Sequence, residues 1–277
     1  MKSLIVLAVL FATATCASIP ESSIVPNDQV KFNQIEGRIV GGIKASRGEF
    51  PYQASISYVR DGYPYHCSGS LISPDFVMTA GHCMYLAQRV VVYLGSNINE
   101  AMEPGTLRLE INAYNNSIFI HDRYYDKDTT NDIALIKLPY NVTFTNYIKA
   151  VALPKRQIVY PLLHNDMVVA SGWGKDSDNG KVTVNLNYVH LPTIKNTVCA
   201  SYYEPGIVKP TNICASTAGG RGTCQGDSGG PIVSRISNTI VGITSFGTKS
   251  CQKGTPVAFT RVHSYLDWIE FKTGIRL

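Results

Sequence analysis

One serine of the chain lies in a setting that suits a nucleophile. The segment CQGDSGGP, Cys224 to Pro231, places Ser228 between Asp227 and two glycines. Gly226 and Gly229 allow backbone conformations in which amide N–H groups converge beside the Ser228 hydroxyl. The same residue types also favour an ordinary surface turn. Because a lone serine is a weak nucleophile, the first interpretation requires a histidine as base and a carboxylate elsewhere in the chain.

Candidates for both partners lie upstream of the serine. TAGHC, Thr79 to Cys83, places His82 at the end of an apolar segment, and NDIAL, Asn131 to Leu135, places Asp132 at the start of another. Taken singly, the histidine also fits an ordinary hydrogen-bonded residue, and the aspartate also fits a turn former. Taken together with Ser228, they supply the three groups that nucleophilic acyl transfer requires.

Short β-rich segments recur along the chain after residue 38. They are Gln53–Val59, Phe76–Ala80, Val90–Leu94, Ile133–Leu138, Met167–Trp173, Leu186–Leu191, Pro231–Ser234, Ile240–Phe246 and Val257–Val262. Turn-forming residues separate them, which predicts an all-β barrel or sandwich, as one large domain or two fused halves. At the C-terminus, Val262, Leu266 and Ile269 recur at helical spacing and predict one amphipathic helix.

The N-terminal segment predicts export. Met1 to Ala17 has Lys2, an apolar run and small residues before a plausible cut after Ala17, which is typical of a signal peptide. The run is too short to span a bilayer, so we expect a soluble, secreted, extracellular protein. Residues 18–38 are polar, have no periodic apolar face and end at Arg38, which predicts a short leader before the folded body, Ile39 to Leu277.

The net charge of +5 is spread along the chain without a basic block. Nucleic-acid binding needs clustered Lys and Arg, so the sequence gives that role little support. No later segment is apolar over the length that a membrane span needs, so no membrane partner is expected.

The remaining cysteines indicate disulfides. Cys16 lies in the signal segment, and six others follow it: Cys67, Cys83, Cys199, Cys214, Cys224 and Cys251. An even number in an exported chain predicts bridges, although the residues alone do not choose among the many pairings. Zinc binding is the competing explanation, but no pair has the Cys-x-x-Cys spacing of a structural site. The sequons that begin at Asn115 and Asn141 are candidate glycosylation sites in the same compartment.

The order His82, Asp132, Ser228, in the contexts TAGHC, NDIAL and GDSGGP, resembles the chymotrypsin/trypsin family of serine endopeptidases. Further family motifs are IVGG at Ile39–Gly42, CSGSLIS at Cys67–Ser73, SGWG at Ser171–Gly174 and FTRVHSYLDWI from Phe259. The resemblance covers the chain from Ile39 to Leu277. With GTPVAFTRV, Gly254 to Val262, the chain is also similar to secreted chymotrypsin-like and collagenolytic proteases of arthropods.

The resemblance implies a fold and a set of catalytic roles. The fold is all-β, with two six-stranded antiparallel Greek-key barrels, roughly residues 39–150 and 151–277, and a C-terminal α-helix. Ser228 would attack the peptide carbonyl, His82 would accept and return the proton, and Asp132 would orient the ring. The backbone N–H groups of Gly226 and Ser228 would form the oxyanion hole. The family uses no metal or other cofactor for this reaction.

The resemblance also implies synthesis as an inactive precursor. Cleavage after Arg38 would free the α-amine of Ile39, which would pair with Asp227 and order the oxyanion loop. The implied disulfides are Cys67–Cys83, Cys199–Cys214 and Cys224–Cys251. The implied partners are protein and peptide substrates, an activating trypsin-like protease and protein protease inhibitors, with the enzyme itself a monomer.

The predicted specificity pocket departs from the best-known relatives. Gly222, followed by Thr223, occupies the position that carries an aspartate in trypsin-like members. The wall Ser245-Phe246-Gly247 has phenylalanine where tryptophan is usual, Val257 aligns where glycine is common, and Gly81 replaces an alanine. Without an acid at its base, the pocket would bury a basic side chain unpaired. We therefore expect chymotrypsin-like preference for apolar and aromatic residues, with elastase-like or collagenolytic specificity as the alternative.

Two other functional classes remain open at this point. An inactive protease homologue that acts as a binding module usually lacks a triad residue, whereas all three are present here. A regulator of an immune cascade usually carries a cysteine-rich domain before the position of Ile39, so a digestive or tissue-degrading endopeptidase fits better.

Overall fold

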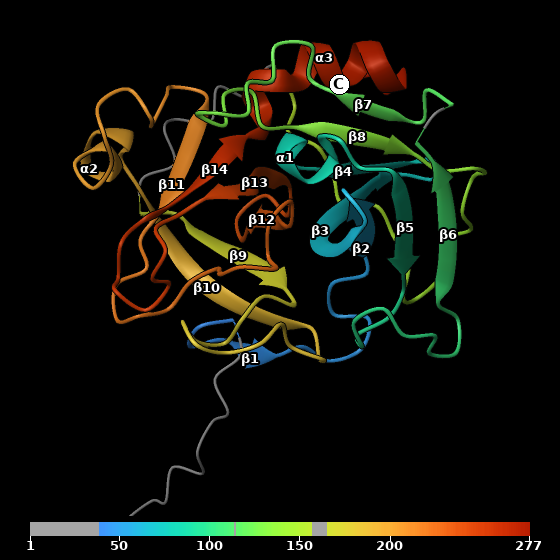
Figure 1. Cartoon of the computed structure of the whole chain (residues 1–277), viewed down its shortest axis with the longest axis horizontal. Helices are drawn as coiled ribbons and strands as arrows, with labels where there is room; N and C mark the ends of the chain where they lie inside the picture. The colour runs from blue at the N-terminus through green and yellow to red at the C-terminus, as the bar shows by residue number, and fades with distance from the viewer. Residues whose placement is uncertain (1–38, 114, 157–164) are drawn as a thin grey trace, which may run out of the picture. The chain divides into compact units, whose positions relative to one another are not determined.

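The computed structural model describes residues 39–113, 115–156 and 165–277 (Figure 1). The predicted signal segment and leader, with Arg38, lie outside the described residues. Within the described part of the chain, no helix is both long and apolar enough to cross a membrane.

The first sheet contains strands from the N-terminal half and is entirely antiparallel. Its order is β6-β5-β2-β3-β4-β8-β7, with β2 Gln53–Arg60, β3 Tyr63–Ser73, β4 Phe76–Thr79, β5 Arg89–Leu94, β6 Leu107–Asn112, β7 Ile118–Ile120 and β8 Ala134–Lys137. The β2–β3 hairpin turns at Asp61 and Gly62, whose φ angles of 51° and 82° are those of a tight turn that matches the strand twist.

The second sheet contains the described strands of the C-terminal half (Figure 1, yellow to red) together with β1. Its order is β1-β10-β11-β14-β13-β12-β9, with β1 Ile43–Lys44, β9 Met167–Gly172, β10 Asn187–Ile194, β11 Asn212–Ala215, β12 Pro231–Ser234, β13 Ile240–Phe246 and β14 Val257–Arg261. Because β9 pairs with both β12 and β10, this sheet closes on itself.

The predicted pair of antiparallel barrel halves is confirmed, with two differences. Each sheet has seven strands rather than six, because β1 and β7 add two and three residues at the sheet edges. Strands this short leave no periodic pattern in a sequence. In addition, β1 comes from the N-terminal half of the chain but pairs with β10 of the second sheet, so no single cut near residue 150 separates the two sheets.

Over the residues that the structure describes, the helices are few and short: α1 Gly81–Met84, α2 Asn196–Ala200 and α3 Leu266–Thr273, the last preceded by a 3₁₀ turn, Val262–Tyr265. The predicted apolar face of the C-terminal helix, Val262, Leu266 and Ile269, is buried. These side chains belong to the same core cluster as the buried residues of the first sheet, and Figure 1 shows α3 beside β7 and β8. The C-terminal segment therefore packs on the N-terminal half.

Candidate active site

Strand pairing brings His82 and Asp132 together where β4 ends and β8 begins. Thr79, the last residue of β4, pairs with Ala134, the first residue of β8. The segment that follows β4 therefore lies beside the segment that precedes β8. His82 lies in α1 directly after β4. Its Nδ1 is 2.8 Å from Asp132 Oδ2, and its backbone N–H donates to Asp132 Oδ1, also at 2.8 Å.

The second sheet supplies the other contacts of Asp132. Ser245 Oγ, on β13, donates to Asp132 Oδ2 at 2.5 Å, and Thr260 Oγ1, on β14, donates to the Asp132 carbonyl at 2.7 Å. The Asp132 side chain is completely buried, whereas the His82 side chain is 25% exposed. The carboxylate is therefore fixed from both sheets, and the ring keeps access to solvent.

The two side chains shift each other's pKa. Burial alone would raise the pKa of Asp132, but the positive charge of His82 and hydrogen bonds from His82 and Ser245 outweigh burial and lower it. For His82, burial acts to lower the pKa, but the Asp132 charge and hydrogen bond outweigh it, so the pKa is raised. Asp132 thus stays ionised and accepts a hydrogen bond from the Nδ1–H group, which leaves Nε2 as the basic nitrogen of neutral His82.

Ser228 lies on a loop that both sheets hold. Its carbonyl accepts a hydrogen bond from the Ser68 N–H, on β3, at 2.7 Å. The next two residues pair with β13: the Gly229 N–H donates to the Thr244 carbonyl, and the Thr244 N–H donates to the Gly230 carbonyl, both at 2.8 Å. Because Ser245 follows Thr244, one strand fixes both the serine loop and the hydrogen bond to Asp132.

The glycines around Ser228 have the backbone geometry that the motif predicts. Gly226 and Gly229 adopt φ angles of 102° and 77°, and a Cβ on Gly229 would collide with Thr79 Oγ1 and the Ser68 carbonyl. Among the described residues, the N–H groups of Gly226 and Ser228 donate to no protein acceptor, whereas the Asp227 N–H between them donates to the Cys224 carbonyl at 3.0 Å. Two amides of this turn thus remain available to a ligand.

Asp227 is fully buried beside the serine. Its carboxylate accepts hydrogen bonds from the Gly174 N–H at 2.7 Å and the Cys224 N–H at 2.9 Å. These contacts lower its pKa less than burial raises it, so the pKa reaches about 7. The SGWG motif makes room for this carboxylate, because a side chain at Gly172 or Gly174 would collide with Asp227.

Comparisons with known proteins show the family of the chain. Residues 39–269 match the family model described as Trypsin. The chain belongs to the trypsin family. One relative, a collagenase from Hypoderma lineatum, is 38% identical over 99% of each chain. Brachyurin from Leptuca pugilator is 40% identical over 86% of this chain and 99% of its own, and a chymotrypsin from Phaedon cochleariae is 35% identical over 98% and 97%.

A solved structure titled HL collagenase is similar at TM-score 0.77 and 38% identity, covering 86% of this chain and all of the other. Together, the family model and the named relatives identify the chain as a chymotrypsin-like serine endopeptidase.

A cavity of about 160 Å³ adjoins the serine of this trypsin-family protease. Ser228, Thr223, Ser245, Phe246, Gly247 and Val257 are among its lining residues, and none of the lining residues carries a charge. Val257 faces Gly247, because its Cγ2 would lie 3.6 Å from a Cβ at that glycine. The protease therefore has an uncharged cavity that Val257 narrows.

Gly222 is the one predicted pocket residue that does not line this cavity. Its N–H donates to the Val40 carbonyl at 3.0 Å, and a Cβ at this position would collide with the Thr217 side chain. Gly222 thus packs against Val40 and Thr217, outside the cavity lining. The same contact holds the start of the protease body, where Ile39 is fully buried in the core of the second sheet.

The described part of the protease contains three disulfides, Cys67–Cys83, Cys199–Cys214 and Cys224–Cys251, the pairs that the family resemblance implies. The first joins β3 to the residue after His82, and the third joins two residues that line the cavity. Within the described residues, the cluster of possible metal ligands is Cys67, His82 and Cys83. Its two sulfurs are bonded to each other, so no thiolate is available for a metal.

Sequence reasoning missed several residues that position the site. Ser245 was predicted only as a pocket wall, although it also donates to Asp132. The roles of Ser68 and Thr260 depend on contacts between sheets and leave no local signal. Gly81 was noted only as a departure from the family, and a Cβ there would lie 2.9 Å from the Tyr124 ring.

Proposed function

We propose that the protein hydrolyses peptide bonds through Ser228, His82 and Asp132. The Ser228 oxygen attacks the substrate carbonyl while His82 Nε2 takes its proton, and the amides of Gly226 and Ser228 donate to the resulting oxyanion. The leaving amine takes the proton from His82, which leaves an acyl-enzyme ester. Water then attacks this ester in the same way and restores the Ser228 hydroxyl.

One observation carries this proposal: His82 donates through Nδ1 to a fully buried Asp132, which leaves Nε2 as its basic nitrogen. The alternative, an inactive homologue that only binds, would not need this buried pair beside a serine loop. The deciding experiment compares casein cleavage by the processed wild-type chain and by Ser228→Ala.

We further propose that cleavage after Arg38 activates the protein. The buried Asp227 carboxylate has a pKa of about 7 because no cation among the described residues offsets its burial, and a free Ile39 ammonium would supply one. Ile39 is already buried, and the Val40 carbonyl accepts a hydrogen bond from the N–H of Gly222, which lies five residues before Asp227. The φ of Ile39 is 45°, which is unfavourable for a β-branched residue and would cease to be constrained at a free N-terminus.

The cavity supports chymotrypsin-like specificity for the residue before the cut bond. Its lining has no acid to pair with Lys or Arg, so a basic side chain would be desolvated without compensation. Val257 limits the depth, which favours Leu, Phe and Tyr over Trp. Elastase-like selection of smaller residues is the alternative, and peptides with Phe, Leu, Ala or Arg at this position distinguish the two.

Collagen is a second candidate substrate, because one relative and one similar solved structure are named as collagenases. Digestion of native triple-helical collagen, compared with heat-denatured collagen, tests it. Cleavage of the heat-denatured collagen but not of the native triple helix would show that the protein acts only on unfolded chains.

We also propose that residues 1–17 direct secretion and that residues 18–38 are an activation propeptide. The three disulfides are consistent with an oxidising extracellular compartment. The proposed partners are protein substrates, a trypsin-like activator and protein inhibitors, with the protease domain, 39–277, acting as a monomer.

A further inference from the structure

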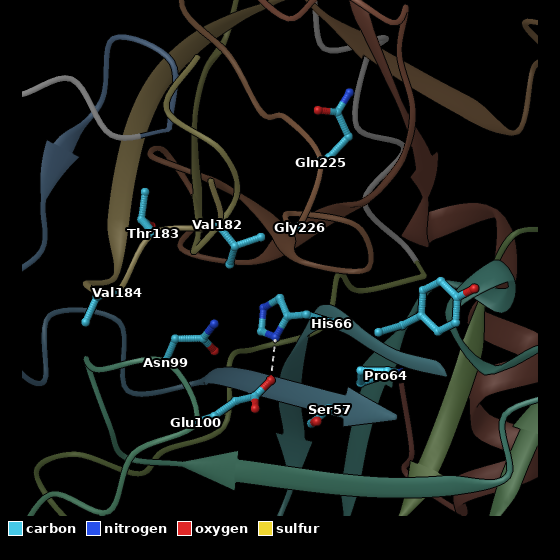
Figure 2. A pocket seen from close by; sticks show the side chains of 11 residues that line it. Ser57, Pro64, His66, Asn99, Glu100, Val182, Thr183, Val184, Gln225 and Gly226 are labelled. Atoms are coloured by element: carbon cyan, nitrogen blue, oxygen red, sulfur yellow. Dashed lines mark hydrogen bonds and ion pairs between the residues drawn. The ribbon is translucent and has the colours of Figure 1, made fainter. Parts of the chain in front are cut away.

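A second cavity, of about 590 Å³, adjoins the serine loop (Figure 2). Gln225 lines both this cavity and the one that contains Phe246 and Val257. Gly226 lines only the second cavity, together with His66 of β3. His66 is two residues before Ser68, whose N–H donates to the Ser228 carbonyl. The second cavity therefore lies toward β3, across Gly226 from the first.

The position of the second cavity indicates which part of a bound substrate would reach it. If the residue before the cut bond occupies the first cavity, the chain after the cut bond must pass over Gly226 toward β3. We propose that the second cavity binds the first two residues after the cut bond and selects a cationic side chain, Arg or Lys, through Glu100. This inference rests on the proposed function.

The lining of the cavity matches the shape and charge of such a side chain. Tyr65, Val182 and Val184 line it and are 42%, 38% and 64% exposed, which offers apolar surface to a methylene stem. Figure 2 shows the Glu100 carboxylate on the same side of the cavity as Asn99, with Val182 on the side toward Gly226. Glu100 is the one acid among the lining residues, and its side chain is 40% exposed, so a cation can reach it.

His66 holds the Glu100 carboxylate in place. His66 Nδ1 lies 3.4 Å from Glu100 Oε1, the contact drawn in Figure 2. Hydrogen bonds from His66 and from Ser57 keep the pKa of Glu100 low despite partial burial, so the carboxylate is ionised at neutral pH. The His66 side chain is only 11% exposed, so it positions Glu100, and the carboxylate contacts the substrate.

Two lysines lie close to the loop that carries Val182. Lys175 forms a β-bridge with Val182, and Lys181 precedes it, but neither side chain is among the lining residues. If their charge dominated the cavity, an acidic residue after the cut bond would be preferred instead. Whether the enzyme prefers a cationic or an acidic residue after the cut bond therefore tests directly whether Glu100 or the lysines face the substrate.

The test uses matched peptides that are identical up to the cut bond and carry Arg, Leu or Glu at the first or second position after it. Rates are divided by the concentration of titrated active sites. For the wild-type enzyme we expect kcat/KM to fall in the order Arg, Leu, Glu. Glu100→Gln should reduce the Arg-to-Leu ratio about two- to fivefold, the range for an ion pair that stays partly hydrated. Glu204→Gln removes the same charge from an exposed loop of the other half and should leave the ratio unchanged.

Three results would overturn the inference: equal rates for the three peptides, a preference for Glu, or an Arg-to-Leu ratio that Glu100→Gln does not alter. Active-site titration separates this failure from that of the proposed function. An enzyme that titrates and cleaves all three peptides equally contradicts only the cation preference. An enzyme that neither titrates nor cleaves any peptide contradicts both.

Discussion

Ser245 donates a 2.5 Å hydrogen bond from the second sheet to Asp132, which lies just before β8 of the first. The carboxylate is fully buried, so removing this donor leaves part of a buried charge unsatisfied. This hydrogen bond therefore contributes to the stability of the protease and also fixes the position of the Asp132 carboxylate.

Ser245→Ala should lower the free energy of unfolding by about 1.5–3 kcal/mol, the usual value of a hydrogen bond to a charged group. Denaturant titration of the processed enzyme measures this change. Ser201→Ala, at an exposed position after α2, is the matched control and should change stability by less than about 0.5 kcal/mol. Equal effects of the two substitutions would contradict the role given to Ser245.

The pH profile reports the state of His82. Its pKa is raised, so at a given pH more of the ring is protonated than in an ordinary histidine, and protonated His82 cannot accept the Ser228 proton. Activity should therefore be lost as pH falls, with the midpoint of kcat/KM above about 6.5. A midpoint clearly below that value, measured on enzyme that remains folded, would show that burial and not Asp132 controls the pKa of His82.

Asp227 should make the uncleaved precursor less stable as pH rises. The folded carboxyl has a pKa of about 7 and the unfolded one about 3.8, so between these values the unfolded state releases the proton first. Stability should fall over this window by at most about 4 kcal/mol and then level off. Asp227→Asn should remove this part of the pH dependence, measured by thermal unfolding of the precursor at pH 4 to 8.

Cleavage after Arg38 provides the complementary measurement. In the processed wild-type enzyme, the new ammonium should lower the pKa of Asp227 and weaken the pH dependence. A precursor and a processed enzyme with the same pH dependence would contradict the proposed pairing of Ile39 with Asp227.

Val257→Gly should deepen the cavity beside Ser228. Val257 faces Gly247, so its removal extends the cavity without adding charge. We expect kcat/KM for a Trp peptide to rise at least tenfold relative to a Leu peptide, in line with about 1–3 kcal/mol per methylene-sized change. An Arg peptide should remain poor in both enzymes, and an Arg peptide cleaved best by the wild type would contradict the pocket assignment.

Much of the fold could be predicted where one face of a strand is buried. The alternation over Gln53–Val59 predicts β2, and the apolar spacing of Val262, Leu266 and Ile269 predicts the terminal helix. Strand β3 was missed because its buried half has small residues in place of alternation. Gly69 belongs there because a Cβ would lie 2.8 Å from Ile56 Cδ1 and 2.9 Å from Val77 Cγ1.

The chemistry-bearing residues could be predicted from motifs, whereas the contacts that position them could not. Ser245 and Asp132 are more than a hundred positions apart, and their hydrogen bond depends on how two sheets pack. Gly222 was predicted at the pocket base, but it packs against Val40 and Thr217 and does not line the cavity beside Ser228. Glu100 lies in a loop without a motif, and only the fold brings it to the cavity beside Gly226.

The central claim is that Ser228 is the nucleophile of a peptide-bond hydrolase. The most direct measurement is the rate of casein cleavage by wild-type chain and Ser228→Ala, both processed after Arg38 by a trypsin-like protease and freed of it. The substitution removes only the hydroxyl of a half-buried side chain, so the variant should fold with unchanged thermal stability. We predict a loss of ~10⁶-fold in kcat. Comparable cleavage by the folded alanine variant would contradict the account.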